Sequence, residues 1–361
     1  MDELRALALL GRSQIRAARL REATPAGCSA AQLLSDPAAL DPPTRARLDA
    51  VSAACIDADL RCLERHGVRL IACTAPEYPT RVARLPDAPA VLYVRGHRDL
   101  IGQAQLAMVG ARAASPGGMA SARELAFELA QAGLAITSGL ARGIDAASHE
   151  GALAAGGATI AVCAHGLDLT YPTDHRALAR RIAAAGALVS ELPPGTPPAR
   201  WRFAARNRLV SGLALGTLVV EARRDSGSLM TARWARRQGR CVLAVPGSIR
   251  TGHSAGCHAL LRSGATLVER ASDVIEALGF RAEKQTLITQ PDVGSSAGAS
   301  PPRLDKACEM LLDALGFEPA SINTLVERTG LPSESLTSML LILELGGRVA
   351  PHPGGGYCRL S

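Results

Sequence analysis

Between residues 90 and 280, short apolar runs alternate with stretches in which apolar residues recur at helical spacing. The runs are rich in Val, Ile, Leu and Ala, as buried strands are, and a helical pattern follows most of them. Repeated strand and helix units predict a parallel sheet with helices on both faces, so we expect an α/β fold of the extended Rossmann-like, doubly wound type. The expected strands are 91–94, 106–109, 134–137, 159–163, 187–190, 217–221, 242–245 and 266–268, and the expected helices are 119–132, 144–155, 173–185, 203–213, 228–238 and 257–262.

Differences in composition divide the chain into four segments. Residues 1–75 show helical spacing throughout and predict an all-helical, SAM-like N-terminal domain. A Pro-rich connection leads into the Rossmann-like domain, which we expect to span 76–280. Residues 281–302 are rich in Gly, Ser and Pro and predict a flexible linker. Residues 303–361 show three helical patterns and two short strand candidates around a glycine turn, which predict a winged-helix domain.

The third helical pattern of the winged-helix segment argues against DNA reading by that helix. Residues 333–344 contain no Lys or Arg, carry Glu334 and Glu344, and are strongly apolar. A helix that reads DNA needs cations for the phosphates and donors for the base edges. We therefore expect a structural or protein-contact role for this domain.

The positive charge of the chain is concentrated in one stretch. The net charge is +7, and residues 196–262 alone hold 12 basic and 2 acidic residues. Such a block in an otherwise neutral chain favours a polyanionic partner, although a solvated basic face would give the same count. The plausible stacking rings near the block are few, and any of them could belong to the core instead: Tyr171, Trp201, Phe203 and Trp234.

Six distinctive loops each begin where an expected strand ends. In a doubly wound sheet these strand ends share one edge, and ligands bind there. The convergence of several loops therefore predicts a binding edge more firmly than one Gly-rich turn would. The loops are 110–112, 138–145, 164–168, 191–195, 221–228 and 246–248.

The residues of these loops are suited to phosphate recognition. Backbone N–H groups left open at a helix N-terminus favour an anion, and Arg adds a permanent charge and forked donors. Asn207, between two arginines, could bond a base or a backbone oxygen. The candidate nucleic-acid-binding residues are Gly110, Arg112, Ser138, Gly139, Arg142, Gly143, Arg206, Asn207, Arg208, Ser226, Gly227 and Ser228.

Several residues of the same loops have a structural interpretation that stays open. Gly139 and Gly143 could serve only tight turns. Asp145 could cap the following helix. His149 could be a satisfied, partly buried histidine, and Glu221 could pair with a nearby Arg to set the geometry of its loop.

The sequence offers no cofactor, metal or catalytic motif. The dinucleotide fingerprint G-x-G-x-x-G is missing after the 106–109 strand, and no P-loop of the G-x-x-x-x-G-K-[ST] type occurs. The nine cysteines contain no C-x-x-C pair, and no Ser/His/Asp arrangement stands out. We see no signal peptide and no run of about 18 apolar residues. We therefore expect no cofactor, no metal, no catalytic residue and no membrane partner, and a place in the reducing cytoplasm.

The chain resembles the DNA-processing protein A family (DprA, also called Smf) in nine sequence segments, which occur in the same order as in that family. The run Thr137-Ser-Gly-Leu-Ala-Arg-Gly-Ile-Asp-Ala-Ala-Ser-His149 is the most specific of them, and together they cover residues 90–270. The segments are 108–112, 137–149, 156–162, 166–168 with 171–172, 190–191, 205–208, 219–222, 226–232 and 244–247.

The resemblance implies a non-enzymatic protein that binds single-stranded DNA in natural transformation and homologous recombination. Such proteins protect incoming strands, help to load the RecA recombinase and commonly act as homodimers. By motif position, Arg112 would contact the strand, Ser138, Gly139 and Arg142 would form a phosphate pocket, and residues 206–208 its basic wall.

Two departures from the family pattern bear on these contacts. Ala111 stands where Ser is usual, which removes one hydroxyl donor, and Ala158 stands where a basic residue is often found.

An alternative function on this type of fold is a nucleotide-processing enzyme similar to the phosphoribohydrolases. Those enzymes use a P-G-G-x-G-T-x-x-E segment with a catalytic Glu, and this chain has no such segment. Its closest analogue is Glu221 with Ser226-Gly227-Ser228, in the wrong order.

Overall fold

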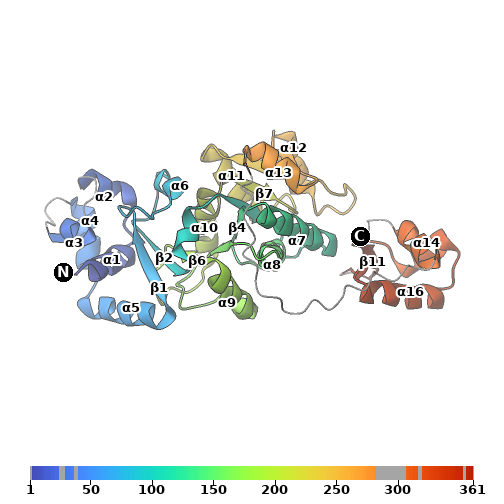
Figure 1. The fold of residues 1–361 in the computed structure, drawn as a ribbon, viewed down its shortest axis with the longest axis horizontal. Helices are drawn as coiled ribbons and strands as arrows, with labels where there is room; N and C mark the ends of the chain where they lie inside the picture. Colours follow the sequence, from blue (N-terminus) through green and yellow to red (C-terminus); the bar gives the residue numbers. More distant parts are fainter. Residues whose placement is uncertain are drawn as a thin grey trace.

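The computed structural model describes residues 2–23, 29–35, 40–281, 306–315, 319–352 and 355–360. Its largest part is a nine-stranded sheet with helices on both faces (Figure 1). The expected linker, 281–302, lies outside the described residues apart from Arg281.

The sheet has the strand order β1-β2-β6-β5-β4-β3-β7-β8-β9. In this spatial order the strands β6-β5-β4-β3-β7-β8-β9 are parallel to one another, which confirms the doubly wound fold. Strands β1 and β2 extend the sheet beyond β6 with antiparallel pairing. The strands are β1 (Val68–Ala72), β2 (Val91–Gly96), β3 (Gln105–Val109), β4 (Ala135–Ser138), β5 (Thr159–Val162), β6 (Ala187–Ser190), β7 (Gly216–Val219), β8 (Cys241–Ala244) and β9 (Thr266–Leu267).

Strand β3 lies near the middle of the sheet and is buried on both faces. Leu106 and Met108 belong to one hydrophobic core, and the alternating Ala107 and Val109 belong to another. This two-sided burial explains why the parallel strands read as continuous apolar runs. Helices α7 (Pro116–Gln131), α8 (Ile144–Ala154) and α13 (Ala271–Leu278) supply the first core, while α10 (Arg200–Leu213), α11 (Ser228–Arg237) and α12 (Ala255–Arg262) supply the second. Helix α9 (Arg176–Ala185), preceded by the short 3₁₀ helix η3 (Thr173–His175), packs beside α8.

The prediction that residues 1–75 are all-helical is wrong at its C-terminal end. The described part of this segment has five helices, but residues 68–72 form β1, which pairs with β2. Helix α5 ends at Gly67, whose φ of 62° is the left-handed conformation that stops a helix. The apolar run at residues 68–72 is too short for the spacing of its apolar residues to distinguish a strand from a helix. The helices are α1 (Glu3–Arg12), α2 (Ala17–Ala23), α3 (Ala30–Ser35), α4 (Pro42–Asp49) and α5 (Ala53–His66).

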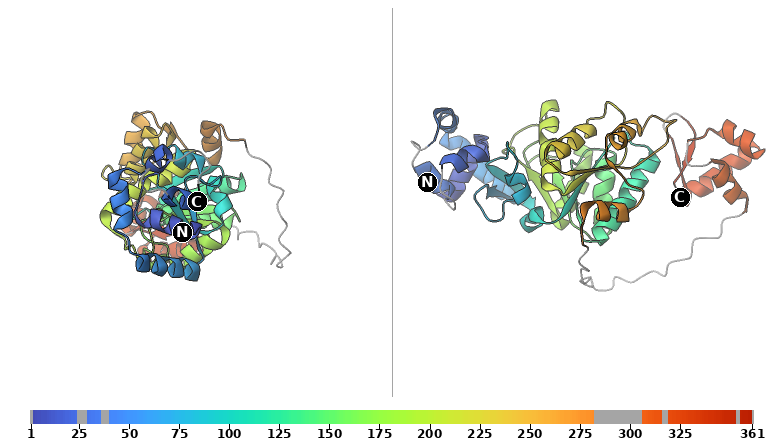
Figure 2. Two further views of the ribbon diagram at one scale, coloured as in Figure 1. Left: turned by 90° about the vertical axis from the view of Figure 1, so that its left-hand side faces the viewer. Right: turned by 90° about the horizontal axis from the view of Figure 1, so that it is seen from above.

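The N-terminal helices share a hydrophobic core with the sheet. Leu10 of α1 and Leu48 of α4 belong to the same buried cluster as Val91 of β2 and Leu209 of α10. Figure 2 shows these helices against the β1 end of the sheet. A short helix, α6 (Thr80–Ala83), lies in the connection between β1 and β2, and a 3₁₀ helix, η2 (Arg98–Gly102), lies between β2 and β3.

The described residues between 306 and 360 form three helices and a two-stranded wing, in agreement with the predicted winged helix. The helices α14 (Lys306–Leu315), α15 (Ile322–Thr329) and α16 (Ser333–Leu345) enclose a separate core. Strands β10 (Val349–Pro351) and β11 (Tyr357–Arg359) pair antiparallel and form the wing.

Candidate nucleic-acid interface

An open cleft of about 1120 Å³ lies at the carboxyl ends of β3 and β7. The strand order reverses at this point, since β3 pairs with β4 on one side and with β7 on the other. Eight of the predicted residues line the cleft: Gly110, Arg112, Gly139, Arg206, Asn207, Ser226, Gly227 and Ser228. The other four, Ser138, Arg142, Gly143 and Arg208, lie outside its lining.

The cleft brings exposed cations close to aromatic rings, and its lining also holds one exposed carboxylate, Asp225. The guanidinium carbon of Arg112, which is exposed, lies 5.4 Å from the ring centroid of Phe203. The Tyr171 ring lies 5.4 Å from that of Phe203, and Trp201 is 63% exposed. Tyr171, Trp201 and Phe203 therefore line a cleft and are not core residues. Such rings and an exposed Arg can each stack on a nucleobase.

Arg200 was not among the predicted residues, although it lies in the basic block. It is exposed and lines the cleft at the start of α10, and the exposed Arg223 belongs to the same lining. The signal that could have identified them is their position, Arg200 at the first residue of a helix and Arg223 in the loop after a strand.

In the loop that follows β4, the backbone N–H groups expected to bind a phosphate bind a carboxylate of the protein, that of Asp145. The Asp145 side chain accepts hydrogen bonds from the backbone N–H of Gly139 (3.2 Å) and of Ala141 (3.3 Å). The Ser138 hydroxyl donates its hydrogen bond to the Met108 carbonyl (2.6 Å), so it does not donate to a phosphate in this geometry. Asp145 lies in the first turn of α8, whose N-cap is Gly143, so it satisfies the preceding loop instead of capping the helix. Burial raises the pKa of Asp145, and the nearby Arg206 opposes that rise.

Arg206 fixes two loops from a buried position. It is 6% exposed and donates to the carbonyls of Gly139 (2.7 Å) and Val162. Burial lowers its pKa, and the Asp145 carboxylate acts in the opposite direction. A Cβ atom at residue 139 would lie 2.5 Å from the Arg206 Nη2 atom, so the glycine makes room for the guanidinium. Gly143 meets a different need, since its φ is +74°.

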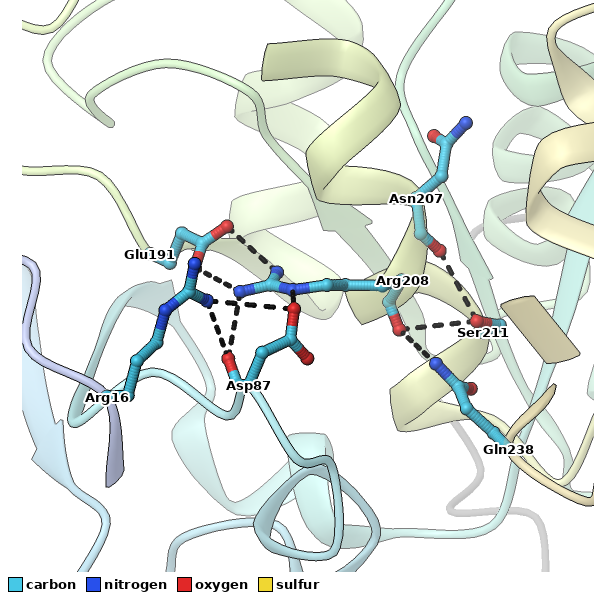
Figure 3. A network of polar contacts seen from close by, with 7 residues as sticks. All are labelled: Arg16, Asp87, Glu191, Asn207, Arg208, Ser211 and Gln238. Atoms are coloured by element: carbon cyan, nitrogen blue, oxygen red, sulfur yellow. Dashed lines mark hydrogen bonds and ion pairs between the residues drawn. The ribbon is translucent and has the colours of Figure 1, made fainter. Parts of the chain in front are cut away.

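Arg208 belongs to an ion-pair network and not to the cleft (Figure 3). Its side chain is 4% exposed, and it makes a bidentate pair with Glu191 at 2.9 and 2.7 Å. It also binds the side chain and the carbonyl of Asp87, to which Arg16 donates as well. Burial lowers the pKa of Arg208, but the two carboxylates together raise it above its usual value. The expected contribution of Arg208 to a basic wall is therefore contradicted by its position, whereas the Asn207 side chain points away from this network (Figure 3).

Arg142 lies on the surface next to the cleft. Its guanidinium pairs with Asp174, and the two side chains are 63% and 61% exposed. Exposed pairs of this kind contribute little to stability, so Arg142 can exchange its partner at small cost.

Glu221 occupies the N-terminus of α7. It accepts hydrogen bonds from the Ser115 N–H (3.0 Å) and the Ser115 hydroxyl, and its carboxylate lies 3.6 Å from His253. Its partners are thus Ser115 and His253 and not the nearby Arg that the sequence suggested. In dinucleotide-binding domains the helix after the first parallel strand receives the pyrophosphate. A protein carboxylate at that position disfavours an anionic cofactor there.

The N-terminus of α11 opens toward the cleft. Gly227 is its N-cap and supplies no side chain, and the hydroxyls of Ser226 and Ser228 bond to each other at 2.7 Å. All three residues line the cleft. A helix N-terminus in this position favours a phosphate group.

Within the described residues, no group of three or more His, Cys, Asp or Glu side chains could hold a metal ion. Over the same part of the chain, no helix is both long and apolar enough to cross a membrane.

A Rossmann-like sheet with a basic cleft at its switch point, followed by a winged helix, describes the class of this protein. The family model of DNA recombination-mediator protein A matches residues 69–279, and that of the DprA winged helix domain matches residues 295–355. The chain belongs to the DNA recombination-mediator protein A family, which the sequence resemblance indicated.

Relatives and solved structures give the same assignment. The chain is 41% identical to protein Smf of Escherichia coli strain K12 over 308 residues, which cover 84% of this chain and 81% of that relative. It is similar in structure to the DNA processing protein A of Streptococcus pneumoniae, with a TM-score of 0.65 and 32% identity over 76% of this chain and 98% of that one. It is also similar to a structure that concerns the single-stranded DNA binding mode of DNA processing protein A from Helicobacter pylori. The TM-score there is 0.53, with 30% identity over 58% of this chain and 95% of that one.

Proposed function

We propose that the cleft binds single-stranded DNA independently of sequence. In this role the protein would protect incoming strands in natural transformation and homologous recombination and help to load the RecA recombinase. The cation–π contact of exposed Arg112 with Phe203 at the switch point carries the proposal, because it holds a charge among the rings of the cleft. The similar Helicobacter pylori protein, whose structure concerns single-stranded DNA binding, supports it.

The exposed cations of the cleft neutralise phosphates, and its rings stack on bases. Arg112, Arg200 and Arg223 are the exposed cations of its lining. Phosphate contacts carry no sequence information, and every base has a face on which a ring can stack. Together they give sequence-independent binding that weakens with salt.

The predicted site residues divide into contacting and positioning groups. We propose that Arg112, Asn207 and residues 226–228 contact the strand, with Arg142 at the rim. Gly110, Ser138, Gly139, Gly143 and Arg206 hold the loops in place, and Arg208 anchors α10 to residues 87 and 191.

We propose a binding protein and not an enzyme. Glu221, the closest analogue of a catalytic carboxylate, is 4% exposed and bonded to Ser115. We further propose a homodimer in the cytoplasm. Its α/β domain would span 68–280, since β1 joins the sheet, and the linker and winged helix would span 281–302 and 303–361.

Fluorescence anisotropy with single- and double-stranded oligonucleotides over a salt series tests the proposal. We expect tighter binding of the single strand, with a steep decrease as salt rises. Arg112→Ala should weaken binding about 10-fold and reduce the slope of log K against log salt by about 0.7, the share of one phosphate contact. Arg142→Ala should weaken it less, since Arg142 lies outside the cleft lining.

Arg61→Ala, an exposed arginine on α5, is the matched control and should bind as the unchanged protein does. Equal affinity for both DNA forms, or indifference to Arg112→Ala, contradicts the proposal. Steady release of a base from nucleoside monophosphates, abolished by Glu221→Gln, would favour the enzyme instead.

A further inference from the structure

A second groove, of about 390 Å³, lies between α11 and α12 outside the cleft. Four arginines line it, namely Arg224, Arg233, Arg236 and Arg262, and we call it the arginine groove. All four are exposed, and no acidic residue is part of its lining. Both helices pack on the same hydrophobic core beside the sheet (Figure 1).

The charges of the arginine groove are not neutralised by the protein. Within the part of the chain that the structure describes, the side chains of Arg224, Arg233 and Arg262 make no ion pair or hydrogen bond, and Arg236 donates only to Ser263. Five other arginines of the basic block differ: Arg206, Arg208 and Arg240 bond to carbonyls or carboxylates, and Arg202 and Arg237 lie over the two tryptophan rings. Four like charges kept together without a counter-charge favour a polyanion.

The arginine groove adjoins the cleft through neighbouring residues of the chain. Arg223 lines the cleft, and the next residue, Arg224, lines the groove. Ser228 and Met230 of α11 face the cleft, whereas Leu229 and Arg233 face the groove.

The loop between the two sites is fixed to α12. The Gly256 N–H donates to the Ala222 carbonyl at 2.7 Å, and a Cβ atom at Gly256 would lie 2.6 Å from the Arg223 carbonyl oxygen. The cleft and the groove are therefore held in one geometry.

We propose that the arginine groove binds the phosphate backbone of the same single strand where it leaves the cleft over the N-terminus of α11. The inference rests on the proposed function of the cleft. Because no aromatic ring lines the groove, it holds the strand through phosphates, and the bases there face solvent. The protein thus covers a longer stretch of strand than the cleft alone can hold.

The test is anisotropy with oligothymidylates of about 4 to about 24 nucleotides, a range that spans the site sizes of single-strand binders. The variant is the full chain with Arg224→Gln, Arg233→Gln and Arg262→Gln. We expect the shortest oligonucleotides to bind this variant within about twofold of the unchanged protein. The longest should bind about 10-fold or more weakly, with a salt slope lower by about 2, the share of three phosphates.

The matched control replaces Arg61, Arg65 and Arg69 by Gln. These arginines are exposed on α5 and β1, and their loss removes the same charge. Their replacement should leave affinity unchanged at every length, and circular dichroism of both variants should match the unchanged protein.

Three outcomes overturn the inference: identical length dependence in the variant and the unchanged protein, an equal loss at all lengths, or an equal loss for duplex and single strand. Failure of the proposed function looks different, because the unchanged protein then binds no oligonucleotide of any length.

Discussion

Arg206 and Arg208 lie on the same helix, and neither offers a free guanidinium to solvent. Arg206 is bonded to the carbonyls of two loops, and Arg208 to two carboxylates. The resemblance to the family placed both arginines in a basic wall. Arg208 is instead bound by Asp87, which lies 121 positions away in sequence. Which arginines stay free is decided by such long-range contacts, and no local pattern reveals them.

Removal of the Arg208 guanidinium should destabilise the fold. Arg208→Ala leaves Glu191 without its bidentate partner in a site where that carboxylate is 19% exposed. Loss of one partner of a buried pair costs about 3–5 kcal/mol, and the 38% exposure of Asp87 reduces this to about 2–3 kcal/mol. Urea denaturation measures the change.

Arg233→Ala on α11 is the control for this prediction and should change the free energy of unfolding by less than about 0.5 kcal/mol. Arg208→Lys should recover only part of the loss, because Lys cannot make the bidentate pair. A loss below about 0.5 kcal/mol for Arg208→Ala contradicts the structural role.

His149 should make stability depend on pH. It is fully buried, its Nδ1 atom lies 2.7 Å from the Thr159 hydroxyl, and burial lowers its pKa to about 3. The unfolded chain, with a pKa of about 6.5, then binds a proton that the folded chain does not, so stability falls as pH drops below about 6.5. Between pH 7 and pH 5 the loss from this residue is about 2 kcal/mol.

The measurement is urea denaturation at several pH values for the unchanged protein and for His149→Asn. The difference between their unfolding free energies should shrink as pH falls, since only the unchanged protein carries this histidine. Burial lowers the pKa of His165 too, so the difference between the two proteins and not the absolute slope is the test. Parallel pH profiles contradict the prediction.

At the scale of elements, strands and loops were predictable for one physical reason. Strands buried on both faces read as apolar runs, and the loops that follow parallel strands meet at one edge. Strand β1 was missed because it pairs antiparallel at the edge and follows a helix directly. The cleft position could be predicted in the same way, but the filling of the 138–145 loop by Asp145 could not, since it depends on how that loop turns.

Helix α16 should not contribute to strand binding. It has no basic residue and exposes Leu341, Ile342 and Leu345 to solvent. Replacement of these three residues by Ser should leave the affinity for a single strand within about twofold, because no phosphate contact is removed. Anisotropy at one salt concentration measures this, and a loss above about fivefold would assign DNA contacts to the winged helix.

At the scale of the whole molecule, the N-terminal helices and the sheet form one hydrophobic core. The shared cluster that contains Leu10 and Leu209 joins the first helix to α10. Cores of this kind couple the elements that line them, so we expect residues 2–23 and the sheet to unfold together.

Leu10→Ala tests this coupling. Leu10 is 1% exposed, and its truncation should cost about 2–4 kcal/mol. The two tryptophans, Trp201 and Trp234, lie on α10 and α11, so their fluorescence reports the unfolding of the sheet region. The denaturation midpoint followed by fluorescence should shift as far as that followed by circular dichroism. Leu4→Ala, at a residue that is 53% exposed on the same helix, should shift neither.

An unchanged fluorescence midpoint, with an early loss of helical signal, would mean that the N-terminal helices unfold as a separate unit.

Photo-crosslinking of a single-stranded oligonucleotide that carries 5-bromodeoxyuridine tests most directly whether the strand lies in the cleft. The crosslinked peptides, identified by mass spectrometry, should contain Tyr171, Trp201 or Phe203, the rings of the cleft lining. The yield should fall with Arg112→Ala. Crosslinks confined to the helices of residues 3–66 or to residues 306–360, with none at these three rings, would contradict strand binding in the cleft.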